Sequence, residues 1–152
     1  MKKLKFAAMA FAAGMFIAMG SQAYAGGIGY INYQKVQEQF PFAQQAVKDI
    51  DAKALEMQQY MVDKEKQYKA LNSPLQKQNF EEATAKEFKM KQDAYMKLKA
   101  SKEEQVYNKI QAATKQVLVE QKLDAILDYR VIFVGGVDIS DLVIQKLKTG
   151  KY

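Results

Sequence analysis

Cysteine and histidine are both absent from this chain of 152 residues. Without cysteine there is neither a disulfide framework nor thiol redox chemistry, and without histidine the commonest general base and the commonest zinc ligand are missing. Carboxylate chemistry stays possible in principle, but the acids lie among many lysines at helical spacing, which is typical of a solvated helix surface. The sequence therefore favours a binding or structural protein over an enzyme, and it predicts neither a cofactor nor a metal site.

Helix-breaking residues are also scarce. The chain has two prolines, Pro41 and Pro74, and no glycine between Gly29 and Gly135. A stretch of that length with so few breakers predicts long helices.

The first 25 residues have the three parts of a secretory signal peptide. Lysines near Met1 precede a run of apolar and small residues from Phe6 to Gly20, and Ala23-Tyr24-Ala25 supplies a small-residue cleavage site. A retained membrane anchor is the alternative, but the run is about 15 residues where a spanning helix needs about 20. We expect cleavage after Ala25, export of the protein and a mature chain of residues 26–152. Loss of three lysines lowers the formal net charge from +6 to +3.

Residues 41–121 predict a helical hairpin with its turn near residues 72–74. Ser73 can cap the second helix, Pro74 suits its first position, and Gln76 completes a capping box. Steps of three and four residues predict a heptad seam in the first helix, whereas the 11-residue spacing of Tyr95, Val106 and Val117 favours a seam without a strict heptad twist in the return helix. A helix of this length would extend roughly 55 to 70 Å. The first seam comprises Val47, Ile50, Ala54, Met57, Met61, Lys64, Tyr68, Leu71 and Leu75, and the return seam, running to about Lys122, comprises Phe80, Phe88, Tyr95, Leu98, Val106, Ile110, Ala113 and Val117.

Such an arm must project from a base, which residues 26–40 and 122–152 would form. We expect a strand at 28–33, a short helix at 34–40, a strand hairpin at 123–128 and 131–134, and a last helix capped by Asp138. The predicted fold class is therefore α+β, predominantly α. Three strands leave two open edges, so association through them, ideally into a closed ring, is expected. The candidate oligomerisation residues are Ile28, Tyr30, Ile31, Ala125, Leu127, Val131 and Phe133.

Three segments carry a family resemblance: 28–32 (IGYIN), 123–134 (LDAILDYRVIFV) and 137–144 (VDISDLVI). Together with the lysine- and glutamine-rich hairpin between them, they resemble the Skp/OmpH-like periplasmic chaperones over essentially the whole mature chain. The resemblance implies a homotrimer whose strands close into a small barrel, with three hairpins around a cavity. It also implies a holdase that keeps unfolded outer-membrane β-barrel proteins from aggregating without ATP.

The arm contains two groups of candidate client-binding residues. Residues 86–102 hold six lysines and two acids, so this stretch attracts acidic chains and allows contact with anionic envelope lipid or lipopolysaccharide. Methionine and tyrosine residues off the predicted seams suit a surface that accepts many sequences, whereas Met57, Met61, Tyr68 and Tyr95 are expected in the seams. The candidates are Lys86, Lys89, Lys91, Lys97, Lys99, Lys102, Tyr60, Met90, Met96 and Tyr107.

Alternative hypotheses remain at this point. The lysine-rich stretch is also what an ordinary solvated helix face looks like. A structural or tethering protein of the envelope would use the same heptads and would show a docking patch at the tip, near residues 72–77. Nucleic-acid binding is not expected, because the chain would be exported and has little of the arginine content or aromatic stacking platform that specific nucleic-acid readers use.

Overall fold

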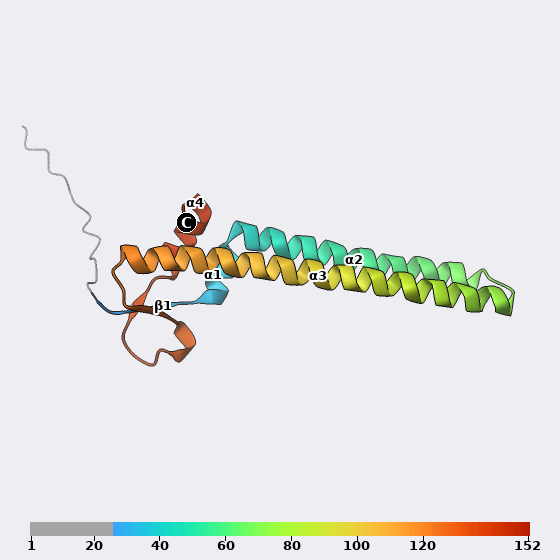
Figure 1. Cartoon of the computed structure of the whole chain (residues 1–152), viewed down its shortest axis with the longest axis horizontal. Helices are drawn as coiled ribbons and strands as arrows, with labels where there is room; N and C mark the ends of the chain where they lie inside the picture. The colour runs from blue at the N-terminus through green and yellow to red at the C-terminus, as the bar shows by residue number, and fades with distance from the viewer. Residues whose placement is uncertain (1–25) are drawn as a thin grey trace, which may run out of the picture.

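The computed structural model describes residues 26–152, an elongated molecule with a long arm and a small base (Figure 1). Two antiparallel helices, α2 (Pro41–Lys69) and α3 (Pro74–Glu120), form the arm. The predicted signal peptide lies outside the described residues. No helix in the described part of the chain is long and apolar enough to span a bilayer. The base contains β1 (Ile28–Ile31), α1 (Tyr33–Gln39), β2 (Ala125–Asp128), the 3-10 helix η1 (Tyr129–Val131), β3 (Val137–Asp138) and α4 (Ser140–Thr149).

The helix boundaries follow the two prolines. Phe40 has extended angles (φ −86°, ψ 113°), so α1 ends there and Pro41 begins α2. Pro74 begins α3 after the N-cap residue Ser73, as predicted, but the Ser73 side chain makes no capping hydrogen bond. With 29 and 47 residues, α2 and α3 are about 43 Å and 70 Å long. The longer α3 therefore continues past the start of α2 and across the base.

The sheet differs from the prediction. All three strands are parallel in the order β2-β1-β3, with Ile28 opposite Ala125 and Gly29 opposite Val137. The predicted hairpin of 123–128 with 131–134 is wrong, because 131–134 is not a strand in this chain and β3 pairs with β1. Asp128 explains the difference: its carboxylate accepts the Arg130 backbone N–H at 2.9 Å and turns the chain into η1.

Two glycines then return the chain to the sheet. Gly135 and Gly136 have φ values of 85° and 82°, which other residues adopt only with strain. A Cβ on Gly136 would also lie 3.2 Å from the Ile28 carbonyl oxygen. This turn places β3 beside β1.

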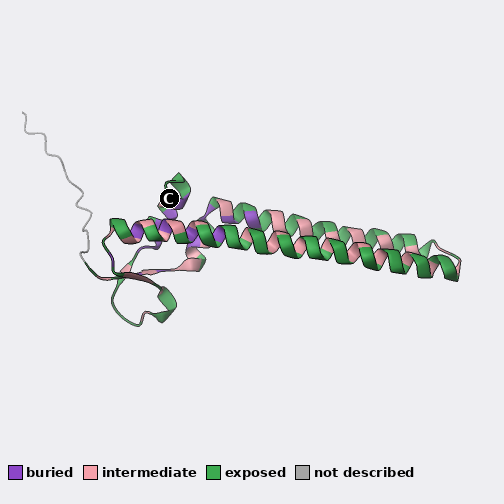
Figure 2. Cartoon of the chain, viewed as in Figure 1, coloured by how far each residue is buried: buried purple, intermediate pink, exposed green. Residues whose placement is uncertain are grey.

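The hydrophobic core lies where α1, α4 and the root of the arm meet one face of the sheet (Figure 2). Gly29 allows this close packing, because a Cβ there would lie 2.8 Å from Leu123 Cδ1. Ile31, predicted as an oligomerisation residue, belongs instead to the core of its own chain and is 9% exposed. The other buried apolar residues are Val36, Phe40, Ala43, Ala46, Val106, Ile110, Ala113, Val117, Leu123, Ile139, Val143, Ile144 and Leu147.

A buried hydroxyl ties the first strand to the last helix. The fully buried Ser140 accepts the backbone N–H of Asn32 at 2.9 Å and donates to Asp138 Oδ1 at 2.6 Å. The Asp138 carboxylate also accepts the Ser140 backbone N–H at 2.9 Å, so it satisfies the first helical N–H, although the N-cap residue is Ile139. Since a buried polar group without a partner is costly, these bonds fix how α4 packs against β1.

Candidate binding surfaces of the arm and base

The outer arm lacks a buried core. No residue from Val47 to Gln105 is buried (Figure 2). Two helices share one seam, and no third element covers its flanks, so the apolar side chains in that seam stay partly exposed. The half-buried apolar and aromatic seam residues are Ile50, Met57, Tyr60, Tyr68, Leu71, Phe80, Phe88, Tyr95 and Leu98.

The predicted seam of α3 is confirmed throughout, whereas that of α2 is only partly correct. Val47, Ala54, Met61 and Leu75 are exposed, and Lys53 and Tyr60 are half-buried in the seam instead. A lysine or tyrosine can take a seam position because its apolar stem packs while its polar end reaches a partner.

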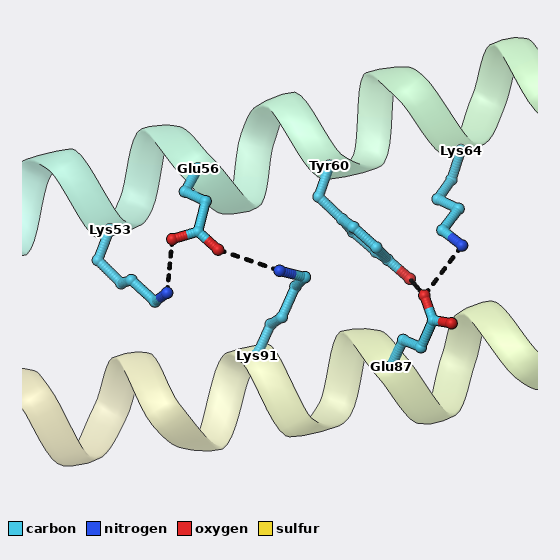
Figure 3. Close-up of polar contacts among 6 residues, drawn as sticks. All are labelled: Lys53, Glu56, Tyr60, Lys64, Glu87 and Lys91. Atoms are coloured by element: carbon cyan, nitrogen blue, oxygen red, sulfur yellow. Dashed lines mark hydrogen bonds and ion pairs between the residues drawn. The ribbon is translucent and has the colours of Figure 1, made fainter.

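Glu87 makes the best-connected polar contact across the seam (Figure 3). Its Oε2 accepts the Tyr60 hydroxyl at 2.7 Å and lies 2.9 Å from Lys64 Nζ. The same ammonium group lies 5.2 Å from the Tyr60 ring centre and 5.3 Å from that of Phe80. One carboxylate from α3 therefore holds two side chains of α2.

Two further ion pairs cross the seam nearer to the base. Lys91 Nζ lies 3.0 Å from Glu56 Oε1, and Lys53 contacts the other oxygen of Glu56 (Figure 3). Lys102 Nζ lies 2.6 Å from Asp49 Oδ2. As the α2 residue number rises from 49 to 56 to 60, the number of its α3 partner falls from 102 to 91 to 87, as an antiparallel hairpin requires. We call the three contacts the seam clamps: Asp49–Lys102, Glu56–Lys91 and Glu87 with Tyr60 and Lys64.

The seam clamps shift the pKa values of their members. Hydrogen bonds from Lys53 and then Lys91 lower the pKa of Glu56, those from Tyr60 and Lys64 lower the pKa of Glu87, and that from Lys102 lowers the pKa of Asp49. Burial, followed by the neighbouring Glu87, raises the pKa of Tyr60. The three clamp carboxylates are therefore charged at neutral pH, whereas the Tyr60 hydroxyl keeps its proton.

The candidate lysines divide into two sets. Lys91 and Lys102 belong to the seam clamps, and Lys99 lies 3.9 Å from Glu103 in its own helix. Among residues 26–152, no ion pair involves Lys86, Lys89 or Lys97. Tyr60, expected off the seam, lies in it, so the prediction of an exposed contact there is wrong.

Six of the ten candidates share one exposed face of α3. At about 100° per residue they fall within about 120° of the helix circumference, on the side away from α2. The methionines and tyrosine on it are 65%, 56% and 52% exposed. This basic face, as we call it, consists of Lys86, Lys89, Met90, Met96, Lys97 and Tyr107.

The base has an exposed apolar surface of its own. Phe133 is 102% exposed, Val134 86% and Val131 69%, and all three follow β2 in the loop before β3. Ile28 and Leu127 of the sheet are also exposed, while Tyr30 and Ala125 are half-buried. The sheet is open in the single chain, because β2 and β3 each pair with one strand only.

The arm and the base both present exposed apolar side chains, and the arm adds exposed lysines. Within residues 26–152, no group of three or more acidic side chains is placed to hold a metal ion. Fold and surfaces together define a binding protein with a projecting arm.

Comparison with known proteins identifies its family. The model of the family "Outer membrane protein (OmpH-like)" matches residues 27–147, and the chain belongs to this family, the Skp/OmpH-like periplasmic chaperones. No curated protein matches the sequence at a significant level. The solved structure of an OmpH-like protein from Caulobacter crescentus is similar over 82% of this chain and 85% of its own, with 14% identity and a TM-score of 0.37. The assignment depends on the family model alone.

The seam clamps predict that the stability of the mature protein depends on pH. Folding lowers the pKa values of Glu56 and Glu87 below their ordinary value of 4.5, so their ion pairs stabilise the folded state at a pH above 4.5. This stabilisation is lost as the pH falls through the lowered pKa values. We expect E56Q/E87Q to be less stable than wild type at pH 7, and the two free energies of unfolding to converge as the pH falls well below 4.5, measured by urea unfolding followed by circular dichroism at 222 nm.

The matched control is D51N/E104Q, which removes two exposed carboxylates that form no ion pair within residues 26–152. This variant should keep the wild-type dependence on pH. Parallel curves for E56Q/E87Q and wild type across the whole range would show that the clamps contribute nothing.

Proposed function

We propose that this protein is an ATP-independent periplasmic holdase that binds unfolded outer-membrane β-barrel proteins and prevents their aggregation in transit. The observation that carries the proposal is the outer arm, a surface of partly exposed apolar and basic side chains without a core of its own. Such a surface can contact many different sequences weakly. Membership of the OmpH-like family supports the same function.

In this proposal the protein acts as a homotrimer joined through its bases. An open sheet edge with unpaired backbone groups favours pairing with another chain. The side chains of Val131, Phe133 and Val134 expose apolar surface to water in the single chain, and an assembly would cover them. Closure of three sheets into one barrel removes the edges and places three arms around a common cavity, where the client would be held.

The basic face would attract acidic stretches of the client before apolar contacts form. Three lysines without an ion pair partner among the described residues leave this face positive, with the exposed Met90 and Met96 between them and the exposed Tyr107 further along the same face. The same charges would attract anionic envelope lipid or lipopolysaccharide. Tethering is the less favoured alternative, since Leu75 is the one large apolar residue of the tip (72–77) and it stands alone there.

Assembly and holding can be tested together by light scattering of residues 26–152. We expect three times the mass of one chain, and less scattering from a urea-unfolded outer-membrane β-barrel protein after dilution into buffer without ATP. F133S should lower the mass to that of one chain and keep the helical circular dichroism, because Phe133 is fully exposed in the single chain.

V119S is the control for assembly, because Val119 is 71% exposed but lies on α3. It should keep the wild-type mass. A monomeric wild type that leaves the client to aggregate would contradict the proposed function.

The basic face yields a second prediction. K86E/K89E/K97E should weaken binding of the unfolded client about tenfold at low salt, and the difference should shrink at high salt because exposed charges are screened. Affinity can be measured by fluorescence anisotropy of a labelled client. K48E/K115E/K148E changes the net charge equally at exposed lysines elsewhere and should have a clearly smaller effect. Equal losses in both variants would indicate attraction by net charge alone.

A further inference from the structure

Two backbone hydrogen bonds join the residues before β1 to the connection between α3 and β2. The Gly26 N–H donates to the Lys122 carbonyl oxygen at 3.0 Å. The Asp124 N–H donates to the Gly27 carbonyl oxygen at 2.9 Å. Both bonds lie just before the first residue pair of β1 with β2, and β1 is the central strand of the sheet. The folded base therefore holds Gly26 directly in front of its central strand.

The end of α3 is shaped so that the Lys122 carbonyl group can accept this bond. Lys122 has a left-handed φ of 51°, and among residues 26–152 it is the one residue other than glycine with a positive φ. The next residue, Leu123, donates its N–H to the Leu118 carbonyl oxygen at 3.0 Å, which is typical of a helix that ends in a left-handed residue. The turn frees the Lys122 carbonyl group from the helix, and Gly26 is its partner.

An acidic side chain lies beside Gly26. A Cβ built on Gly26 would lie 3.5 Å from Asp124 Oδ2 and 4.0 Å from Asp124 Oδ1. Apart from the chain neighbours of Gly26, no other described residue has an atom within 4 Å of that point. Within residues 26–152, the Asp124 carboxylate forms no ion pair. An acid without a cationic partner therefore lies within reach of the Gly26 backbone nitrogen.

The sequence predicts that a signal peptidase cleaves the bond between Ala25 and Gly26. Hydrolysis of this amide consumes one water molecule and, at neutral pH, leaves a carboxylate on Ala25 and an ammonium group on Gly26. We propose that the new ammonium group pairs with the Asp124 carboxylate while it keeps its hydrogen bond to the Lys122 carbonyl oxygen, so that processing locks β1 into the base. Before cleavage the same nitrogen is an uncharged amide, whose single N–H is already used by Lys122.

This lock makes the base more stable in the processed protein than in the unprocessed chain. Release of β1 would break both pairings of the sheet, because β2 and β3 each pair with β1 alone. An exposed ion pair contributes modestly, so the effect is an adjustment of stability and not an all-or-none switch. The inference goes beyond the proposed function, because it links export to folding of the base and holds whether or not the arm binds a client.

The test removes the new charge and its partner separately and together. Residues 26–152 are produced with a free amino group or, with a co-expressed Nα-acetyltransferase, as an acetylated chain that keeps the N–H and loses the charge. Hydrogen–deuterium exchange of β1 and β2 is then compared for wild type and D124N in both forms. We expect acetylation and D124N each to speed exchange about two- to fivefold, the range for one exposed ion pair, and to have no larger effect when combined.

D51N is the matched control, because Asp51 is also exposed and forms no ion pair within residues 26–152 but lies on α2. It should exchange like wild type, and acetylation should affect it equally. The mass of the full chain after export should correspond to a start at Gly26. A different start, equal exchange of the free and acetylated forms, or effects of acetylation and D124N that add would overturn the lock. None of these results bears on whether the protein is a holdase.

Discussion

A two-helix arm cannot enclose a hydrophobic core, and the remaining structure depends on this constraint. Each helix of the hairpin can bury one stripe against the other, and the flanks of that seam stay open. Full burial occurs only at the root, where Ala43 and Ala46 of α2 and Val106 and Ile110 of α3 meet the base. The base therefore anchors the arm, and beyond the root polar contacts such as the seam clamps join α2 to α3.

The same constraint produces the surfaces that suit a holdase. Clamps such as Glu87 with Tyr60 and Lys64 hold the helices in register with charges and hydroxyls, so apolar side chains remain within reach of another chain. Exposed salt bridges contribute modestly to stability, which leaves the outer arm free to adapt. The basic face lies on the side of α3 away from α2, so its charges are separated from the apolar side chains of the seam on one arm.

Local sequence patterns predicted much of this fold. The features that could not be predicted depend on contacts between residues that are far apart in the sequence. The prolines located both arm helices, and the spacing of apolar residues located the α3 seam. In α2 the apolar pattern favoured Met61, but the seam passes through Tyr60, whose hydroxyl partner Glu87 is 27 residues away. The parallel pairing of β1 with β2 joins Ile28 to Ala125 across the whole arm, a pairing that local alternation cannot reveal. Four apolar residues in a row, 131–134, looked like a strand, but Val131 ends η1 and the other three lie in the loop that follows it.

Hydrogen–deuterium exchange along the arm of the mature protein tests the anchoring most directly, because it reports the opening free energy of each segment. The account predicts strong protection for residues 106–117 of α3, and a decline through residues 80–98 toward the tip, with α2 showing the same gradient outward from Ala46. Uniform protection along the whole of α3, or stronger protection at the tip than at the root, would contradict an arm held mainly by its base.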